Sequence, residues 1–326
     1  MTRAYISYWR TPPCRMPEGP ECRLHAERLH ARFASHTLRR AAILSGRYAG
    51  GGSTPGRQAP PADWSLFCDA LPAVVLSVCS KGKFIWWSLR PHSGALPELT
   101  FWSTLGMSGA WSTHRTVHSR VAFELLASGA SDESGRTVLF YNDQRNFGTL
   151  TVCLDHARLE AKLASLGPSW LGEGVPLPLF LQIAHNQCSS ARRASVPLVK
   201  FLMDQSKTSG IGNYILSEVL YKAAIHPWAT CGELTDDDWR ALHSAITQTI
   251  ETSYASQAAL AIAAGNGSLS ATRGTFDDIE PRFTLLVYRR MHTSEGLPVL
   301  RDEGLHGRAI FWVPSRQLNG YADKQK

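Results

Sequence analysis

The chain has 326 residues, 44% of them hydrophobic, which is enough for about two domains with buried cores. Lys and Arg outnumber Asp and Glu by 34 to 27, so the net charge of +7 favours a polyanionic partner, with a plain basic globular protein as the alternative. The seven cysteines form no CxxC pair and no apolar run reaches the roughly 20 residues of a membrane span, which excludes a paired-cysteine zinc cluster, a disulfide framework and a membrane partner.

The first half of the chain is predicted to be mostly β-structure. A helix of about three turns is expected within 17–36, where Leu24, Leu29 and Phe33 recur among charged residues. A loop rich in Gly and Pro follows at 50–61. The β-branched and aromatic stretches after it predict an antiparallel sheet or sandwich with hairpins, and they occupy residues 71–90, 98–111, 119–128 and 136–154.

The second half is predicted to be helical. Residues 156–167 and 177–204 have a helical period, and Thr235 is expected to cap a helix whose apolar stripe comprises Trp239, Leu242, Ile246 and Ile250. A linker is expected at 265–281, followed by two hairpin strands at 282–291 and 307–317. The fold class is therefore α+β.

Four stretches have patterns with both a structural and a functional explanation: MPEGPE (16–21), TLGMSG (104–109), YNDQRNFGTL (141–150) and LMDQSKTSGIGNYILSEVLYKAAIHPW (202–228), the last with a Gly-x-Gly-Asn turn between two predicted helices. Each has a plain structural explanation when taken alone. The first is a tight turn, Met107 fills a core gap, Arg145 is a surface arginine beside a core Phe147, and Asn213 caps a helix.

Taken together and in this order, the four stretches resemble the formamidopyrimidine-DNA glycosylase and endonuclease VIII family of bifunctional base-excision repair enzymes. The resemblance runs from Met16 to about Gln317. It implies a catalytic β-sandwich flanked by helices over 17–155, a helix-two-turns-helix DNA-binding domain over 156–264, and a linker with a finger hairpin over 265–326. Residues 1–16 are then expected to be an untranslated, removed or disordered extension.

The resemblance implies that Pro17, as the mature N-terminus, is the nucleophile and that Glu18 is its acid/base partner. An α-amino group has a pKa of roughly 8, so part of it is neutral at physiological pH, and a secondary amine gives a cationic iminium with the sugar. Glu18 can protonate the sugar as the base departs. Glu21 matches a supporting acid, and Lys83, preferred over Lys81 because of the KF-apolar pattern after it, matches a catalytic lysine that contacts the phosphate.

Met107, Arg145 and Phe147 match the three residues that fill the space left by an everted base. Asn146 stands where relatives usually have a second arginine. Asn213, with the preceding Gly212, and Lys200 match positions that contact DNA phosphates, which position the protein without reading sequence.

Arg308 matches the finger arginine that the family presents to DNA at the active site. No cysteine follows Cys231, and His292 and His306 alone cannot complete the four-coordinate shell of a structural zinc. The resemblance therefore predicts a zincless finger packed by Phe311, Trp312 and Val313, with no cofactor.

The implied function is a monomeric DNA glycosylase with AP lyase activity, which acts on oxidised bases in damaged double-stranded DNA through a Schiff base and β/δ-elimination. Oxidised pyrimidines are slightly favoured over 8-oxoguanine and formamidopyrimidines, because residues 265–283 lack the purine-type loop signature. Two alternatives stay open: a catalytically silent damaged-DNA-binding protein, if Pro17 remains internal, and an RNA-binding protein with a similar helical motif.

The expected location is a reducing, intracellular one. The unpaired cysteines favour the nucleus, nucleoid or cytoplasm. An organelle is possible because Arg3, Arg10 and Arg15 have no acidic residue among them.

Overall fold

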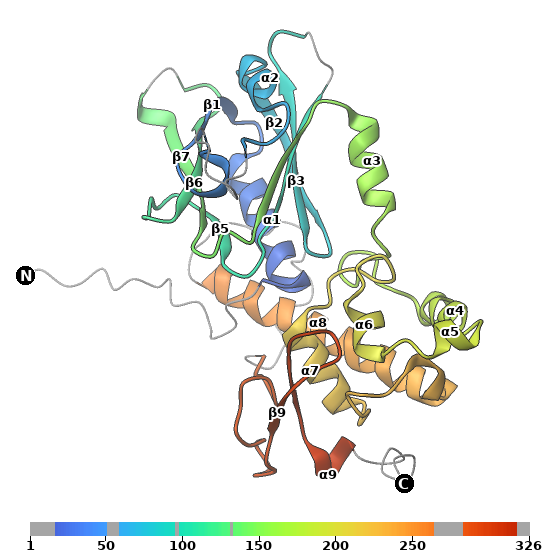
Figure 1. Cartoon of the computed structure of the whole chain (residues 1–326). Coiled ribbons are helices and arrows are strands. Elements are labelled where there is room, and N and C mark those ends of the chain that lie inside the picture. The colour runs from blue at the N-terminus through green and yellow to red at the C-terminus, as the bar shows by residue number, and fades with distance from the viewer. Residues whose placement is uncertain (1–16, 51–58, 95–97, 131–132, 264–282, 318–326) are drawn as a thin grey trace, which may run out of the picture.

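The computed structural model describes residues 17–50, 59–94, 98–130, 133–263 and 283–317. The predicted extension at 1–16, the predicted linker at 265–281 and most of the predicted Gly/Pro-rich loop lie outside these residues. A sheet domain occupies the upper part of Figure 1 and a helical domain the lower part, with the C-terminal hairpin beside the helices.

The N-terminal domain is an eight-stranded antiparallel sheet with a helix packed against it. All of the strand pairs are antiparallel, and the strand order is β5-β7-β6-β1-β2-β3-β4-β8. The elements are α1 (Gly19–Phe33), β1 (Thr37–Ile43), η1 (Gly46–Tyr48), α2 (Trp64–Asp69), β2 (Ala73–Lys81), β3 (Phe84–Pro91), β4 (Leu99–Thr104), β5 (Gly109–Ser112), β6 (Ser119–Leu126), η2 (Glu133–Gly135), β7 (Arg136–Asp143) and β8 (Thr149–Cys153).

The sheet bends so that its two halves face each other, which gives the predicted sandwich from one continuous sheet. Trp111 on the edge strand β5 lies 5.8 Å, between ring centroids, from Phe101 on β4, although these strands stand six places apart in the strand order. The indole N–H of Trp111 donates to Ser103 Oγ at 3.2 Å, also across the core. Aromatic rings therefore fill the interior, and this core holds the strand ends rigidly in place.

The helical domain follows the predicted pattern, with more interruptions. Its elements are α3 (His156–Ala164), α4 (Leu177–Gln187), α5 (Ala191–Ala194), α6 (Leu198–Met203), α7 (Asn213–Lys222), η3 (Cys231–Glu233) and α8 (Asp236–Ala263). The segment 177–204 is broken into three helices. Pro197 is the N-cap of the third, α6, because proline fits the start of a helix and not its interior. Thr235 and Asp238 form the expected capping box of α8, and the predicted apolar stripe is buried.

The C-terminal hairpin has its second strand within the predicted segment 307–317, but its first strand lies outside the predicted segment 282–291. Its strands are β9 (Leu300–Glu303) and β10 (Ala309–Trp312), followed by α9 (Pro314–Gln317). Of the expected strand at 282–291, the described residues 283–291 form turns instead. The reason is the buried carboxylate of Glu218 on α7, which accepts the backbone N–H groups of Leu286, Val287 and Tyr288 at 2.8, 3.0 and 2.8 Å.

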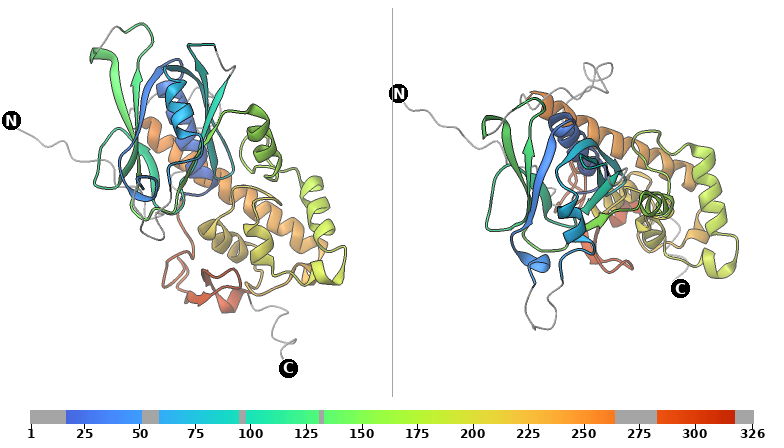
Figure 2. Two further views of the ribbon diagram at one scale, coloured as in Figure 1. Left: turned by 45° about the horizontal axis from the view of Figure 1, so that its top comes forward. Right: turned by 90° about the horizontal axis from the view of Figure 1, so that it is seen from above.

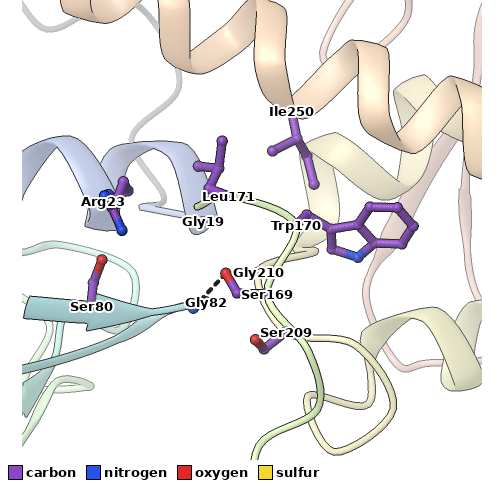
Figure 3. Close-up of a pocket in the computed structure, with 10 residues that line it drawn as sticks. All are labelled: Gly19, Arg23, Ser80, Gly82, Ser169, Trp170, Leu171, Ser209, Gly210 and Ile250. Atoms are coloured by element: carbon purple, nitrogen blue, oxygen red, sulfur yellow. Dashed lines mark hydrogen bonds between the residues drawn. The ribbon is translucent and has the colours of Figure 1, made fainter. Parts of the chain in front are cut away.

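The two domains meet closely through α1 and the β2–β3 turn. The long helix α8 runs beneath the sheet domain and along the helical domain, as both views in Figure 2 show. The backbone N–H of Gly19 donates to Gly210 O at 2.9 Å, and that of Gly82 donates to Ser169 Oγ at 3.4 Å (Figure 3). A Cβ at Gly82 would lie 2.6 Å from the Cβ of Ser209, so only glycine permits this approach. None of the helices in the described part of the chain is both long and apolar enough to cross a membrane.

Candidate active site

A cavity of about 630 Å³ lies where the sheet domain, the helical domain and the hairpin meet. It brings together most of the residues that the sequence predicts to be functional. These are Pro17, Glu18, Lys83, Met107, Phe147, Gly212, Asn213 and Arg308. Three domain segments far apart in the sequence therefore contribute to one site.

Glu18 is the best-defined group in this cavity. Its side chain is 2% exposed, and its carboxylate accepts the backbone N–H groups of Tyr214 at 2.8 Å and Ile215 at 3.3 Å. These N–H groups belong to the first turn of α7, whose N-cap, Gly212, has no side chain to satisfy them. A Cβ at Gly212 would lie 2.2 Å from Cδ of Glu18, so glycine leaves the space that the carboxyl group occupies.

The environment of Glu18 keeps its carboxyl group protonated at neutral pH. Burial raises the pKa of Glu18 to about 8. The positive charge of Lys83 and the two N–H donors lower it, whereas the charge of Glu21 raises it, and burial outweighs the lowering effects. A protonated carboxyl group beside Pro17 can act as a general acid.

Glu21 supports Glu18, the N-cap of α1, from the first turn of that helix. Its carboxylate accepts the backbone N–H of Glu18 at 2.9 Å, the hydroxyl of Tyr214 at 3.1 Å and the side-chain amide of Gln257 at 2.6 Å. The last two donors come from α7 and α8, so Glu21 connects the start of α1 to the helical domain. Burial raises the pKa of Glu21, which these hydrogen bonds partly offset.

Lys83 and Lys81 have different surroundings. Lys83 lies in the turn between β2 and β3 and lines the cavity. Burial lowers the pKa of Lys83, and the charge of Glu18 acts in the opposite direction. Lys81 instead donates to the carbonyl oxygens of Leu163 and Leu166, both at 2.9 Å, and thereby holds the end of α3.

Two neighbouring loops at one side of the cavity carry the three predicted void-filling residues. Met107 lies between β4 and β5, and Arg145 and Phe147 lie between β7 and β8. Met107 is half-buried, Arg145 is exposed and Phe147 is 58% exposed. Arg145 Nη1 lies 3.7 Å from Met107 Sδ, and Met107 and Phe147 both line the cavity, so the structure brings the three residues together.

The predicted phosphate-binding residues are only partly brought together. Asn213 lines the cavity as the first helical residue of α7, with Gly212 in the capping position. Its amide donates to Ala309 O at 2.8 Å and its oxygen lies 2.8 Å from His306 Nε2, so it also joins α7 to the hairpin that carries Arg308. Lys200 is exposed on α6 and does not line the cavity.

The sequence analysis missed other residues at this site. Tyr214 and Gln257 hold the two glutamates, and Cys22, Lys162 and Gln205 line the cavity. Cys22 was detectable, because it lies one helical turn after Glu18 and therefore on the same face of α1. Gln257 had no local signal, since its contact depends on how α8 packs against α1.

Among the described residues, no three His, Cys, Asp or Glu side chains are placed to hold a metal ion together. His306 is engaged with Asn213. The hairpin is instead packed through Phe311, Trp312 and Val313, which are all buried, and the indole of Trp312 donates to Asp302 at 2.7 Å.

Family models match both domains of the chain. The formamidopyrimidine-DNA glycosylase N-terminal domain matches residues 16–150, and the formamidopyrimidine-DNA glycosylase H2TH domain matches residues 178–263. This fold and site define a DNA glycosylase of base-excision repair. The chain belongs to the formamidopyrimidine-DNA glycosylase family.

Individual relatives agree with this assignment. The formamidopyrimidine-DNA glycosylase of Thermus thermophilus is 29% identical over 72% of this chain and 74% of its own length, and that of Arabidopsis thaliana is 27% identical over 72% and 57%. The crystal structure of the MutM (Fpg) protein from Thermus thermophilus is similar, with a TM-score of 0.65 at 25% identity over 93% of this chain and 100% of that one. The Lactococcus lactis enzyme bound to DNA with an AP site has the same fold, with a TM-score of 0.67 at 18% identity over 92% and 99%.

Proposed function

We propose that this glycosylase removes oxidised bases from damaged double-stranded DNA as a monomer and then cleaves the abasic site as a lyase, with Pro17 as the nucleophile. The observation that carries this proposal is the pairing of Pro17 with the buried Glu18, whose pKa is about 8, in a cavity with Lys83. A proton donor and a nucleophile next to each other are what excision of a base requires.

The chemistry assigns one role to each group. Glu18 gives its proton to the sugar ring oxygen as the C1′–O4′ bond breaks, and the lone pair of the Pro17 ring nitrogen forms a bond to C1′. The N–H proton of Pro17 passes through Glu18 to the base, which leaves with the electrons of its bond to C1′ as the nitrogen lone pair forms the iminium. The Glu18 carboxylate then takes a proton from C2′, and the electron pair of the resulting enamine expels the 3′-phosphate. Lys83 supplies a positive charge for the phosphate next to the lesion.

The rim of the cavity supports eversion of the damaged base. Met107, Arg145 and Phe147 project together from one edge, and such side chains can enter the space that the base leaves. Arg308, Asn213 with Gly212, and Lys200 are assigned to the phosphate backbone, although Lys200 would act outside the cavity. We expect the protein to prefer duplex DNA over RNA, and such a preference would exclude the alternative of an RNA-binding protein.

The finger is proposed to function without zinc or another cofactor. Buried Phe311, Trp312 and Val313 supply packing in the hairpin. The described cysteines are all unpaired, which supports a reducing compartment. For the substrate, oxidised pyrimidines remain our first choice, and formamidopyrimidines, after which the relatives are named, are the second.

Borohydride trapping tests this function. The chain beginning at Pro17 is mixed with duplexes that contain an oxidised pyrimidine, a formamidopyrimidine or 8-oxoguanine, and the reduced covalent adduct is measured. An adduct is expected with at least one lesion, and Pro17→Gly should reduce its yield at least tenfold.

The matched control is the chain that keeps residue 16, verified by N-terminal sequencing. In that chain the nitrogen of Pro17 is an amide without a basic lone pair, so no adduct at Pro17 is expected. If the chain with a verified free Pro17 gives no adduct with any lesion yet binds damaged DNA, the catalytically silent binding protein is the correct function.

A further inference from the structure

The two loops that carry the proposed void-filling residues are joined by strand pairing on both sides. The loop 105–108 connects β4 to β5, and the loop 144–148 connects β7 to β8. Thr104 pairs with Thr149, and Gly109 pairs with Asp143. The two loops therefore begin and end side by side, although about forty residues separate them in the chain.

Asp143 lies between these loops and binds both of them. Its side chain is buried, with 1% of the residue exposed. One carboxylate oxygen accepts the hydroxyl of Ser108 at 2.6 Å and the backbone N–H of Arg145 at 3.2 Å, and the other accepts the backbone N–H of Gly148 at 2.8 Å. One buried carboxylate thus binds the residue after Met107, the first residue of the Arg145–Phe147 segment and the residue that follows this segment.

A second contact supports the same loop from behind. Arg47 in η1 donates from Nη1 to the carbonyl oxygens of Asn146 and Gly148, both at 3.1 Å. Asn146 has a φ of 55°, a left-handed conformation that asparagine tolerates better than most residues. Asn146, which stands where relatives usually carry arginine, therefore forms a bend in the backbone here, and Arg47 holds this bend through its hydrogen bonds.

We propose that Asp143 is a positioning residue for base eversion, which holds Met107, Arg145 and Phe147 as one preformed wedge. This inference rests on the proposed function but concerns the step before the chemistry at Pro17. Without the carboxylate, the polar groups of both loops lose their common partner, and the loops that carry Met107, Arg145 and Phe147 are no longer held together at this point. A displacement of about 1 Å at such a site can cost on the order of 100-fold in rate.

Base eversion can be measured without any chemistry. A duplex with a tetrahydrofuran abasic analogue and a neighbouring 2-aminopurine reports unstacking as a rise in fluorescence when the wedge enters. For Asp143→Asn in the chain beginning at Pro17, we expect the rate of this rise to fall on the order of 100-fold. Trapping on an abasic site in single-stranded DNA, which requires no wedge, should stay within about twofold of wild type.

Two further variants keep the test decisive. Ser108→Ala retains the carboxylate and loses the hydroxyl, which donates to Asp143 and accepts the backbone N–H of Arg145 at 3.0 Å. The carboxylate still binds Arg145 and Gly148 in this variant, so the fall in the fluorescence rate should be smaller, and the variant replaces Asp143→Asn if that variant does not fold. Glu124→Gln removes a surface carboxylate that pairs with Arg136 away from the cavity and should change neither signal.

The outcomes separate this inference from the proposed function. Unchanged fluorescence in both loop variants, or a parallel loss of fluorescence and single-strand trapping, would overturn the positioning role of Asp143. A fluorescence rise in the wild type that Asp143→Asn slows, with no adduct from either protein, would contradict the chemistry at Pro17 and support the role of Asp143.

Discussion

The carboxyl group of Glu18 is held by opposing electrostatic effects within one cavity. Burial raises its pKa, and the charge of Lys83 and the N–H groups at the start of α7 lower it. The folded-state pKa of about 8 lies above the ordinary value of 4.5, so the folded protein binds the proton more tightly than the unfolded chain. The bound proton therefore adds to the free energy of unfolding at low pH, and this contribution is lost as the pH rises from 4.5 through 8.

The same shift determines the pH dependence of base excision. Because the proton on Glu18 is the one donated, the single-turnover rate of base release should fall about tenfold per pH unit above about 8. Below that, the rate should rise with pH as the amine of Pro17, with a pKa of roughly 8, loses its proton. Base release from an oxidised duplex, measured from pH 5 to 10, should therefore give a bell-shaped profile.

Lys83 provides the control for this assignment. Lys83→Ala removes a charge that lowers the pKa of Glu18, so the falling limb should move to higher pH, whereas Lys83→Arg keeps the charge and should leave the limb in place. A falling limb that stays unchanged in Lys83→Ala would mean that a different group donates the proton.

At the scale of elements, Glu218 fastens the C-terminal region to α7. Its carboxylate accepts three consecutive backbone N–H groups, those of Leu286, Val287 and Tyr288. Glu218 is itself fully buried, and burial raises its pKa. The hairpin that bears Arg308 begins at Leu300, after this anchored segment and the residues 289–299, so its placement at the cavity depends on a residue outside the cavity.

Removing this anchor should destabilise the protein strongly. Glu218→Ala leaves three buried donors without a partner, and at about 1–3 kcal/mol for each such group the free energy of unfolding should fall by roughly 3 kcal/mol or more. Urea unfolding followed by tryptophan fluorescence measures this loss. Glu251 on α8 is exposed, so Glu251→Ala should change the free energy of unfolding by less than about 0.5 kcal/mol. Similar small losses in both variants would refute the anchoring role.

The same anchor explains where prediction from sequence failed. Residues 283–291 are rich in β-forming side chains, yet their N–H groups bind Glu218 and cannot form a ladder. Leu300–Glu303 carries three charged residues and no β-pattern, yet it pairs with β10. By contrast, Pro17 and Asn213 were predictable because each lies inside a contiguous motif, whereas Gln257 acts through a contact that only tertiary packing creates.

At the scale of the whole molecule, close backbone contacts join the domains around the cavity. Gly19 and Gly82 approach Gly210 and Ser209 too closely for a larger side chain to fit without movement. These contacts bring the start of α1 and the turn that carries Lys83 against the loop before α7. Residues of both domains line the cavity, so it forms only when the two domains are docked. DNA bound to either domain therefore lies next to the same cavity.

The net charge of +7 and the exposed Arg308 at the cavity lead to a prediction about DNA affinity. Contacts to phosphate release counterions, so the logarithm of the binding constant should fall linearly with the logarithm of the salt concentration. Arg308→Ala should reduce the slope of that line by about 1. The affinity of the Arg308→Ala protein should fall to the same extent for damaged and undamaged duplexes, because phosphate contacts do not depend on the identity of the base.

Fluorescence anisotropy over a salt series with both duplexes measures these slopes. Arg301→Ala on β9, another exposed arginine of the hairpin that does not line the cavity, is the matched control and should change the slope less. If Arg308→Ala weakened binding to the damaged duplex alone, Arg308 would contact the lesion itself. Its place at the cavity would then serve recognition of the damaged base and not attachment to the DNA backbone.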